Sequence, residues 1–163
     1  MRIGVVSDTH NNLKNIEKII NLFNEEKVEL VIHTGDIANV KSLNKFSNLQ
    51  SEMIGVYGNN DRNEMGIKEA ACSNNFKFKE PPNILTLCNR NIAIFHEPDC
   101  IDDFLIENKN TNIVIHGHTH RYRNEIKNGV LFFNPGECAG IRKGGSAIGI
   151  LDLNSLKIKR IFF

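Results

Sequence analysis

Three short apolar runs in the first sixty residues constrain the fold of this chain most strongly. They are Ile3–Val6, Val28–Ile32 and Met53–Tyr57. A continuous apolar run of this length is typical of a strand that is covered on both faces. Apolar residues recur at helical spacing between Leu13 and Phe23, and a shorter helix is expected over Val40–Phe46. Because strands alternate with helices, we predict an α/β fold built on a parallel sheet.

The second half of the chain is richer in strands. Asn128-Gly129 is a strong signal for a two-residue hairpin turn, and it separates expected strands over Tyr122–Lys127 and Val130–Phe133. Helices are expected around Glu64–Asn75 and Cys100–Glu107. We therefore predict a second sheet that packs on the first, with helices outside and one domain over residues 1–163. The other expected strands are Asn83–Cys88 and Asn91–Phe95 around a turn at Asn89-Arg90, Ile113–Ile115, and Ser146–Leu151 and Leu156–Phe162 around Asn154-Ser155.

The composition argues against a highly charged partner. The net charge is +1, so no large field draws the chain to nucleic acid or to a membrane surface. We interpret the basic pairs Arg121/Arg123 and Lys157/Lys159 as solvated strand faces. No apolar stretch approaches the ~20 residues of a membrane span, and the start of the chain does not resemble a signal peptide. Four scattered cysteines fit reduced thiols, so we predict a cytoplasmic protein, with strand edges that could pair two copies into a homo-oligomer.

Polar side chains with metal-binding chemistry follow the ends of the expected strands. Ile113–Ile115, for example, leads directly into a stretch with histidines at alternate positions. Ligands of open α/β sheets bind beyond the carboxyl ends of the strands, so we expect these side chains to share one edge. The set comprises Asp8, His10, Asp36, Asn59, His96, His118 and His120.

This set of ligand types favours a hydrolytic metal site. Carboxylate, amide and imidazole ligands without cysteine suit Mn²⁺, Fe, Ni²⁺ or Zn²⁺, and they do not suit a structural thiolate zinc. Seven ligands are too many for one open catalytic ion and suit two ions about 3.5–4 Å apart that share a carboxylate. His33 and His116 also lie beside strand ends, and we interpret them as packing or supporting residues.

Four residues of the set also have a purely structural interpretation when each is taken alone. Asp8 can cap a helix, and Asp36 suits a turn. Asn59 and Asn60 also suit a turn, and a lone His96 is more often a buried histidine satisfied by hydrogen bonds. Only the joint placement of the whole set favours a metal site.

The motifs, in their order along the chain, resemble those of the calcineurin-like metallophosphoesterase superfamily. With Asn134-Pro135-Gly136-Glu137 and the chain length, they are similar to its small single-domain archaeal and bacterial phosphodiesterases. The resemblance implies two packed mixed sheets flanked by helices, which is a four-layer α-β-β-α fold. The matching motifs are Asp8-Thr9-His10, Gly35-Asp36, Gly58-Asn59-Asn60-Asp61, His96 and Gly117-His118-Thr119-His120.

The resemblance further implies how two divalent metal ions would be divided among the ligands. By the family's pattern Asp36 bridges the two ions. Mn²⁺ is the ion expected first, and Ni²⁺, Fe or Zn²⁺ are alternatives. One ion would take Asp8, His10 and His120, and the other would take Asn59, His96 and His118.

Two positions depart from the family's pattern. Larger phosphoprotein phosphatases carry a histidine that assists the leaving group where this chain has Asn60, which cannot act as a general acid. The family usually has glycine where this chain has Glu97, and an inward carboxylate there would weaken phosphate binding. We therefore expect activity on good leaving groups rather than efficient protein dephosphorylation.

The resulting hypothesis is hydrolysis of a phosphodiester, a small nucleotide or a phosphomonoester by a hydroxide that bridges two divalent metals. Asn59 would steady the charge on the phosphoryl oxygens, and Asp61 would orient His10 or a water. The alternatives are a phosphatase or nuclease of the same superfamily, or a protein-binding scaffold like the retromer subunit of this fold. A scaffold is expected to lose ligating histidines, whereas all positions are filled here. A nuclease is expected to carry added DNA-binding segments, for which 163 residues leave little room.

Overall fold

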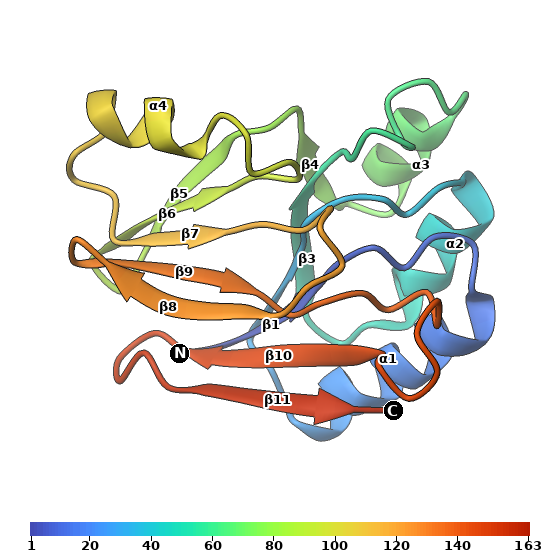
Figure 1. Cartoon of the computed structure of the whole chain (residues 1–163). Coiled ribbons are helices and arrows are strands. Elements are labelled where there is room, and N and C mark those ends of the chain that lie inside the picture. Colours follow the sequence, from blue (N-terminus) through green and yellow to red (C-terminus); the bar gives the residue numbers. More distant parts are fainter.

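The computed structural model describes residues 1–163 as four layers (Figure 1). Three helices cover the outer face of a six-stranded sheet, a five-stranded sheet packs on its other face, and the fourth helix covers that second sheet. This arrangement confirms the predicted α/β fold of two mixed sheets flanked by helices. The helices are α1 (Leu13–Glu25), α2 (Val40–Lys45), α3 (Ile67–Ser73) and α4 (Ile101–Glu107), and a 3₁₀ turn spans Phe46–Asn48.

The six-stranded sheet contains the predicted βαβαβ unit. Its first three strands pair in parallel. The next-to-last strand of the chain pairs antiparallel with the first, and the last strand pairs antiparallel with the next-to-last. A short parallel strand after α3 was not predicted. Its central residue, Phe78, packs against Tyr57, with 5.5 Å between the ring centres. The order is β11 (Ile158–Phe162), β10 (Ala147–Asp152), β1 (Arg2–Val6), β2 (Leu30–His33), β3 (Glu52–Val56) and β4 (Lys77–Lys79).

The five-stranded sheet combines a parallel centre with a hairpin at each edge. Asn128-Gly129 forms the predicted turn with φ angles of 52° and 80°. The turn of the other hairpin lies at Cys88-Asn89, one residue earlier than expected, because these two residues adopt φ angles of 49° and 59° and Arg90 already begins a strand. The order is β5 (Asn83–Leu87), β6 (Arg90–Ile94), β7 (Ile113–Ile115), β9 (Val130–Asn134) and β8 (Arg123–Lys127).

Strand β1 divides the main apolar core into two parts. Ile3 and Val5 belong to the cluster between the two sheets, whereas Val6 belongs to the cluster under α1 to α3. Gly4 faces α1, where the ring of Phe23 occupies the space that a Cβ atom would need. The strand is therefore covered on both faces, as its continuous apolar run predicts.

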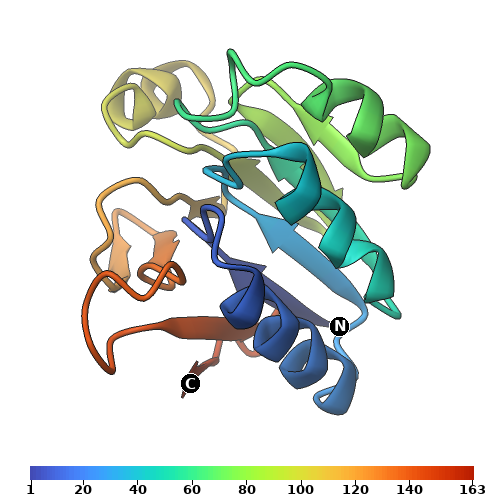
Figure 2. The same ribbon diagram turned by 90° about the vertical axis from the view of Figure 1, so that its right-hand side faces the viewer.

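The loops that follow the parallel strands of both sheets meet at one edge of the molecule (Figure 2). The amide of Asp8 donates to the carbonyl of Gly35 at 3.1 Å, and the amide of Gly117 donates to the carbonyl of His96 at 3.0 Å. The ring of His96 reaches across from the second sheet to the carbonyl of Thr34 at 2.8 Å. None of the helices combines the length and the apolar character that crossing a bilayer requires.

Candidate metal centre

Several of the predicted ligands have a strained backbone. A non-glycine residue with positive φ is uncommon, and such residues concentrate at functional sites. Five of the seven predicted ligands adopt this conformation, which turns successive side chains of a loop toward the same edge. They are Asp8 (51°), His10 (44°), Asp36 (58°), His118 (65°) and His120 (56°).

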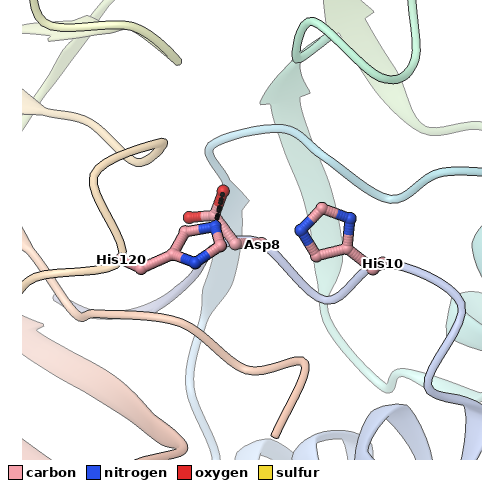
Figure 3. A group of neighbouring side chains, drawn as sticks. All are labelled: Asp8, His10 and His120. Atoms are coloured by element: carbon pink, nitrogen blue, oxygen red, sulfur yellow. Dashed lines mark ion pairs between the residues drawn. The ribbon is translucent and has the colours of Figure 1, made fainter. Parts of the chain in front are cut away.

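The first cluster of candidate ligands brings Asp8, His10 and His120 together from two loops (Figure 3). Nε2 of His120 lies 3.4 Å from Oδ1 of Asp8, and this carboxylate raises the pKa of His120. The other carboxylate oxygen of Asp8 accepts the hydroxyl of Ser7 and the amide of His118, so it is already oriented by the protein. Asp8 Oδ1 and His10 Nε2 are buried without any hydrogen-bond partner. Two unsatisfied atoms with lone pairs in one cluster fit a bound cation.

The second cluster lies around His96, which is fully buried. Its Nε2 faces Oδ1 of Asp36 at 3.3 Å and Oδ1 of Asn59 at 3.0 Å. The Asn59 oxygen also lies 3.1 Å from Nδ1 of His118. The buried atoms of Asp8, Asp36 and His96 lie within 4.8 Å of one another, so Asp8 is common to both clusters.

The hydrogen bonds of His96 determine which ring nitrogen is available to a metal. Its Nδ1 lies 2.8 Å from the carbonyl of Thr34, which can only accept, so the ring proton resides on Nδ1. In the neutral ring, Nε2 then directs a lone pair at the oxygens of Asp36 and Asn59. A backbone carbonyl that fixes a histidine in this way is the usual support for a metal-ligating Nε2.

Asp36 lies between the two clusters. Its Oδ1 is near His96, and its Oδ2 lies 3.9 Å from Nε2 of His10. Although burial would raise the pKa of Asp36, the adjacent His96 ring, when it is protonated, and the hydrogen bonds donated by Asn60 hold it well below its usual range. Gly58 permits this arrangement, since a Cβ atom there would collide with the carboxylate and amide of Asp36. The carboxylate is thus ionised, and its two oxygens lie toward the two clusters.

Comparison with known proteins agrees with this geometry. Residues 1–156 match the family described as the calcineurin-like phosphoesterase superfamily domain. The chain belongs to this superfamily. It is 36% identical to Phosphodiesterase MJ0936 of Methanocaldococcus jannaschii, over 99% of this chain and 98% of that protein. The match confirms the predicted family and the predicted class of enzyme, a hydrolase of phosphoesters.

Solved structures of other phosphoesterases share the fold. A novel archaeal phosphodiesterase superposes with a TM-score of 0.91 at 36% identity, covering 100% of both chains. The phosphoesterase Yfce from E. coli superposes with a TM-score of 0.72 at 21% identity, covering 99% of this chain and 98% of that chain. The second likeness concerns the fold alone.

Asp61 of this phosphoesterase contacts the backbone of the loop that carries Asp36, and no hydrogen bond joins it to His10. Its carboxylate is fully buried and accepts four backbone N–H groups at 2.8 Å, from Asp36, Ile37, Ala38 and Gly58. Burial nevertheless raises its pKa. Asp61 therefore holds the strained loop after β2, which carries Asp36, against the loop after β3. It contacts the centre only by way of the Asp36 loop.

Glu97 does not point into the phosphoesterase centre as an isolated carboxylate. Its Oε2 accepts from Nη2 of Arg62 at 2.6 Å, which neutralises it and joins the loops after β3 and β6. Asn60 likewise has a partner that the sequence did not reveal, because its Nδ2 donates to Oδ2 of Asp36 at 2.6 Å. Neither contact has a sequence signal, since the partners lie 35 and 24 residues apart.

His33 and His116 occupy supporting positions, as their interpretation as packing residues expected. Nδ1 of His33 accepts the amide of Gly35, so Nε2 carries the proton and donates to the hydroxyl of Thr9 at 3.1 Å. Complete burial lowers the pKa of His33 to about 3. His116 is buried behind the loop, where its Nδ1 donates to the carbonyl of Gly117 at 3.2 Å.

Proposed function

We propose that this protein is a metal-dependent phosphodiesterase with a dinuclear site for divalent ions, of which Mn²⁺ is the first candidate. The buried Nε2 of His96 carries the proposal, because its lone pair faces the Asp36 and Asn59 oxygens with no proton between them when the ring is neutral. Divalent ions at such a site lower the pKa of a bound water and neutralise the charge of a phosphoryl group. The orphaned Oδ1 of Asp8 and Nε2 of His10 support a second ion.

The division of ligands predicted from the family's pattern is compatible with these contacts. Asp36 reaches toward His10 with one oxygen and toward His96 with the other, as a bridging carboxylate must. Asn59 and His118 approach His96 from the exposed side of the centre, where a substrate phosphate has access. We assign Asn59 the further role of holding a phosphoryl oxygen through its amide N–H group, since Oδ1 faces the two histidines.

Two observations favour a diester as the substrate: the name of the similar archaeal protein and the chemistry of Asn60. The similar archaeal protein is named a phosphodiesterase. In this chain the side chain of Asn60 donates to Asp36, and a primary amide is not acidic enough to protonate a leaving group. A good leaving group needs no such proton, so we infer that the substrates are small phosphodiesters with stabilised leaving groups.

The experiment is hydrolysis of bis(p-nitrophenyl) phosphate by protein that has been stripped of metal and reloaded with Mn²⁺. We expect turnover that disappears with a chelator, and a loss of at least about a hundredfold in Asp36→Asn. Asp103→Asn, which changes an exposed carboxylate on α4, is the matched control and should keep full activity. No turnover by the reloaded protein, or no effect of Asp36→Asn, would exclude the proposed function.

A further inference from the structure

A recess that contains two arginines is lined in part by the loop that carries His118 and His120. It has a volume of about 450 Å³, and Thr119 in its wall lies between the predicted ligands His118 and His120. Two guanidinium groups line the recess, and no carboxylate does. The lining residues are Pro98, His116, Thr119, Arg121, Tyr122 and Arg123.

Arg121 contributes an uncompensated positive charge to this recess. Its side chain is exposed and forms no ion pair or hydrogen bond in the molecule. Its backbone is nevertheless held in place, because the amide donates to the hydroxyl of Thr119 at 3.3 Å, and that hydroxyl also accepts from Asn134 at 3.2 Å. A charged group on an anchored loop is available to a ligand without breaking any internal contact.

Arg123 provides a second guanidinium that is fixed before any ligand arrives. Its Nε and Nη2 both contact the carboxylate of Glu125, at 2.7 and 2.6 Å, so its charge is balanced by that ion pair and Arg121 supplies the unpaired charge of the recess. The guanidinium carbon lies 4.2 Å from the centre of the Phe132 ring. Nη1 lies 3.5 Å from Nε2 of His116, whose lone pair faces it because Nδ1 donates to Gly117. Contacts on these sides preorganise the guanidinium, so little side-chain entropy is lost when an anion binds.

We infer that this recess binds a second phosphoryl group of the substrate, separate from the one that is hydrolysed. The inference rests on the proposed function and names the class of diester, one that carries another phosphate group. Arginine is the preferred residue for such recognition because its N–H groups match phosphate oxygens in pairs. The recess does not favour stacking of a nucleobase on the ring of Tyr122. The guanidinium carbon of Arg160 lies 4.5 Å from the centre of that ring and covers one of its faces.

The experiment compares two activated diesters that differ only in the second phosphate. These are the p-nitrophenyl ester of thymidine 5′-phosphate and the same ester with an added 3′-phosphate. We expect kcat/KM of the Mn²⁺-loaded protein to be about tenfold higher for the second compound, and Arg121→Gln to remove this advantage while leaving the first compound within twofold. Lys41→Gln, which removes an exposed cation on α2, should leave both values unchanged, and Arg121→Lys should retain part of the preference.

Calorimetry distinguishes binding of the substrate's second phosphate group from binding of free inorganic phosphate. Thymidine 3′,5′-bisphosphate should bind more tightly than thymidine 5′-phosphate in the wild type and equally in Arg121→Gln. Equal kcat/KM for the two esters, or an Arg121 dependence seen with inorganic phosphate alone and without any advantage of the bisphosphate, would overturn the inference. Failure of the proposed function is distinguishable, because neither ester would then be hydrolysed.

Discussion

Nε2 of His96 faces Oδ1 of Asp36 across 3.3 Å in a fully buried position, and the only proton of the neutral imidazole lies on the opposite nitrogen, beside Thr34. Burial alone would lower the pKa of His96, but the hydrogen bond and charge of Asp36 raise it overall. A proton on Nε2 and a metal ion therefore compete for the same place. We therefore expect a metal ion bound at this centre to be released as the pH falls.

The three alternate histidines of the loop after β7 should differ in their effect on metal loading. We expect His118→Ala and His120→Ala each to remove about one ion per chain and most of the activity. His116→Ala should keep both ions, since His116 is buried, contacts Gly117 and Arg123, and belongs to neither cluster of candidate ligands. Elemental analysis after Mn²⁺ saturation and gel filtration measures the difference. Equal losses in all three variants would contradict the assignment.

Asp61→Asn should weaken metal binding through the loop of Asp36. An amide in place of the carboxylate directs N–H groups at backbone donors, so at least one of the four hydrogen bonds at 2.8 Å is lost. We expect a loss of about 2–3 kcal/mol in unfolding free energy and a 10–100-fold weaker affinity for Mn²⁺. Urea unfolding and metal titration measure these two quantities. Lower stability with an unchanged Mn²⁺ affinity would limit Asp61 to a structural role.

The leaving group should control the rate more strongly than in an enzyme with a general acid. Asn60 occupies the position of the assisting histidine of larger phosphatases, and its amide is bound to Asp36. For a series of substituted aryl phosphodiesters, kcat/KM should fall steeply as the pKa of the departing phenol rises. A flat series would mean that another residue of this chain protonates the leaving oxygen.

His33 should make the metal-free protein less stable in acid. Burial lowers its pKa to about 3 from an ordinary value of 6.5, so below pH 6.5 the unfolded chain binds a proton that the folded chain excludes. This contribution is present above pH 6.5 and is lost as the pH falls, by about 2 kcal/mol between pH 7 and pH 5. Urea unfolding of the wild type and of His33→Gln at both pH values isolates it. The stability difference between the two proteins should shrink by that amount at pH 5, and a constant difference would contradict a neutral His33.

The sequence was most informative where local pattern determines structure. The apolar runs predicted β1 to β3, and the placement of polar residues after strands predicted which side chains share an edge, because the carboxyl ends of parallel strands necessarily meet there. Strand β4 was missed although Phe76-Lys77-Phe78-Lys79 alternates, because a strand of only three residues leaves too short a pattern.

Contacts between distant loops could not be predicted from pattern. The hydrogen bonds of Asp61 to the backbone of Asp36 span 25 residues and depend on how two loops pack. Arg121 and Arg123 were interpreted as parts of a solvated strand face, but β8 begins only at Arg123, and both residues line the recess. Such roles follow from tertiary geometry, which neither charge nor spacing encodes locally.

The number of Mn²⁺ ions bound per chain tests the central claim most directly. Protein stripped of metal, dialysed to equilibrium against saturating Mn²⁺ at neutral pH and analysed for metal content should hold two ions per chain, and Asp36→Asn should hold fewer. Fewer than one ion per chain in the wild type under these conditions would contradict a dinuclear phosphodiesterase centre.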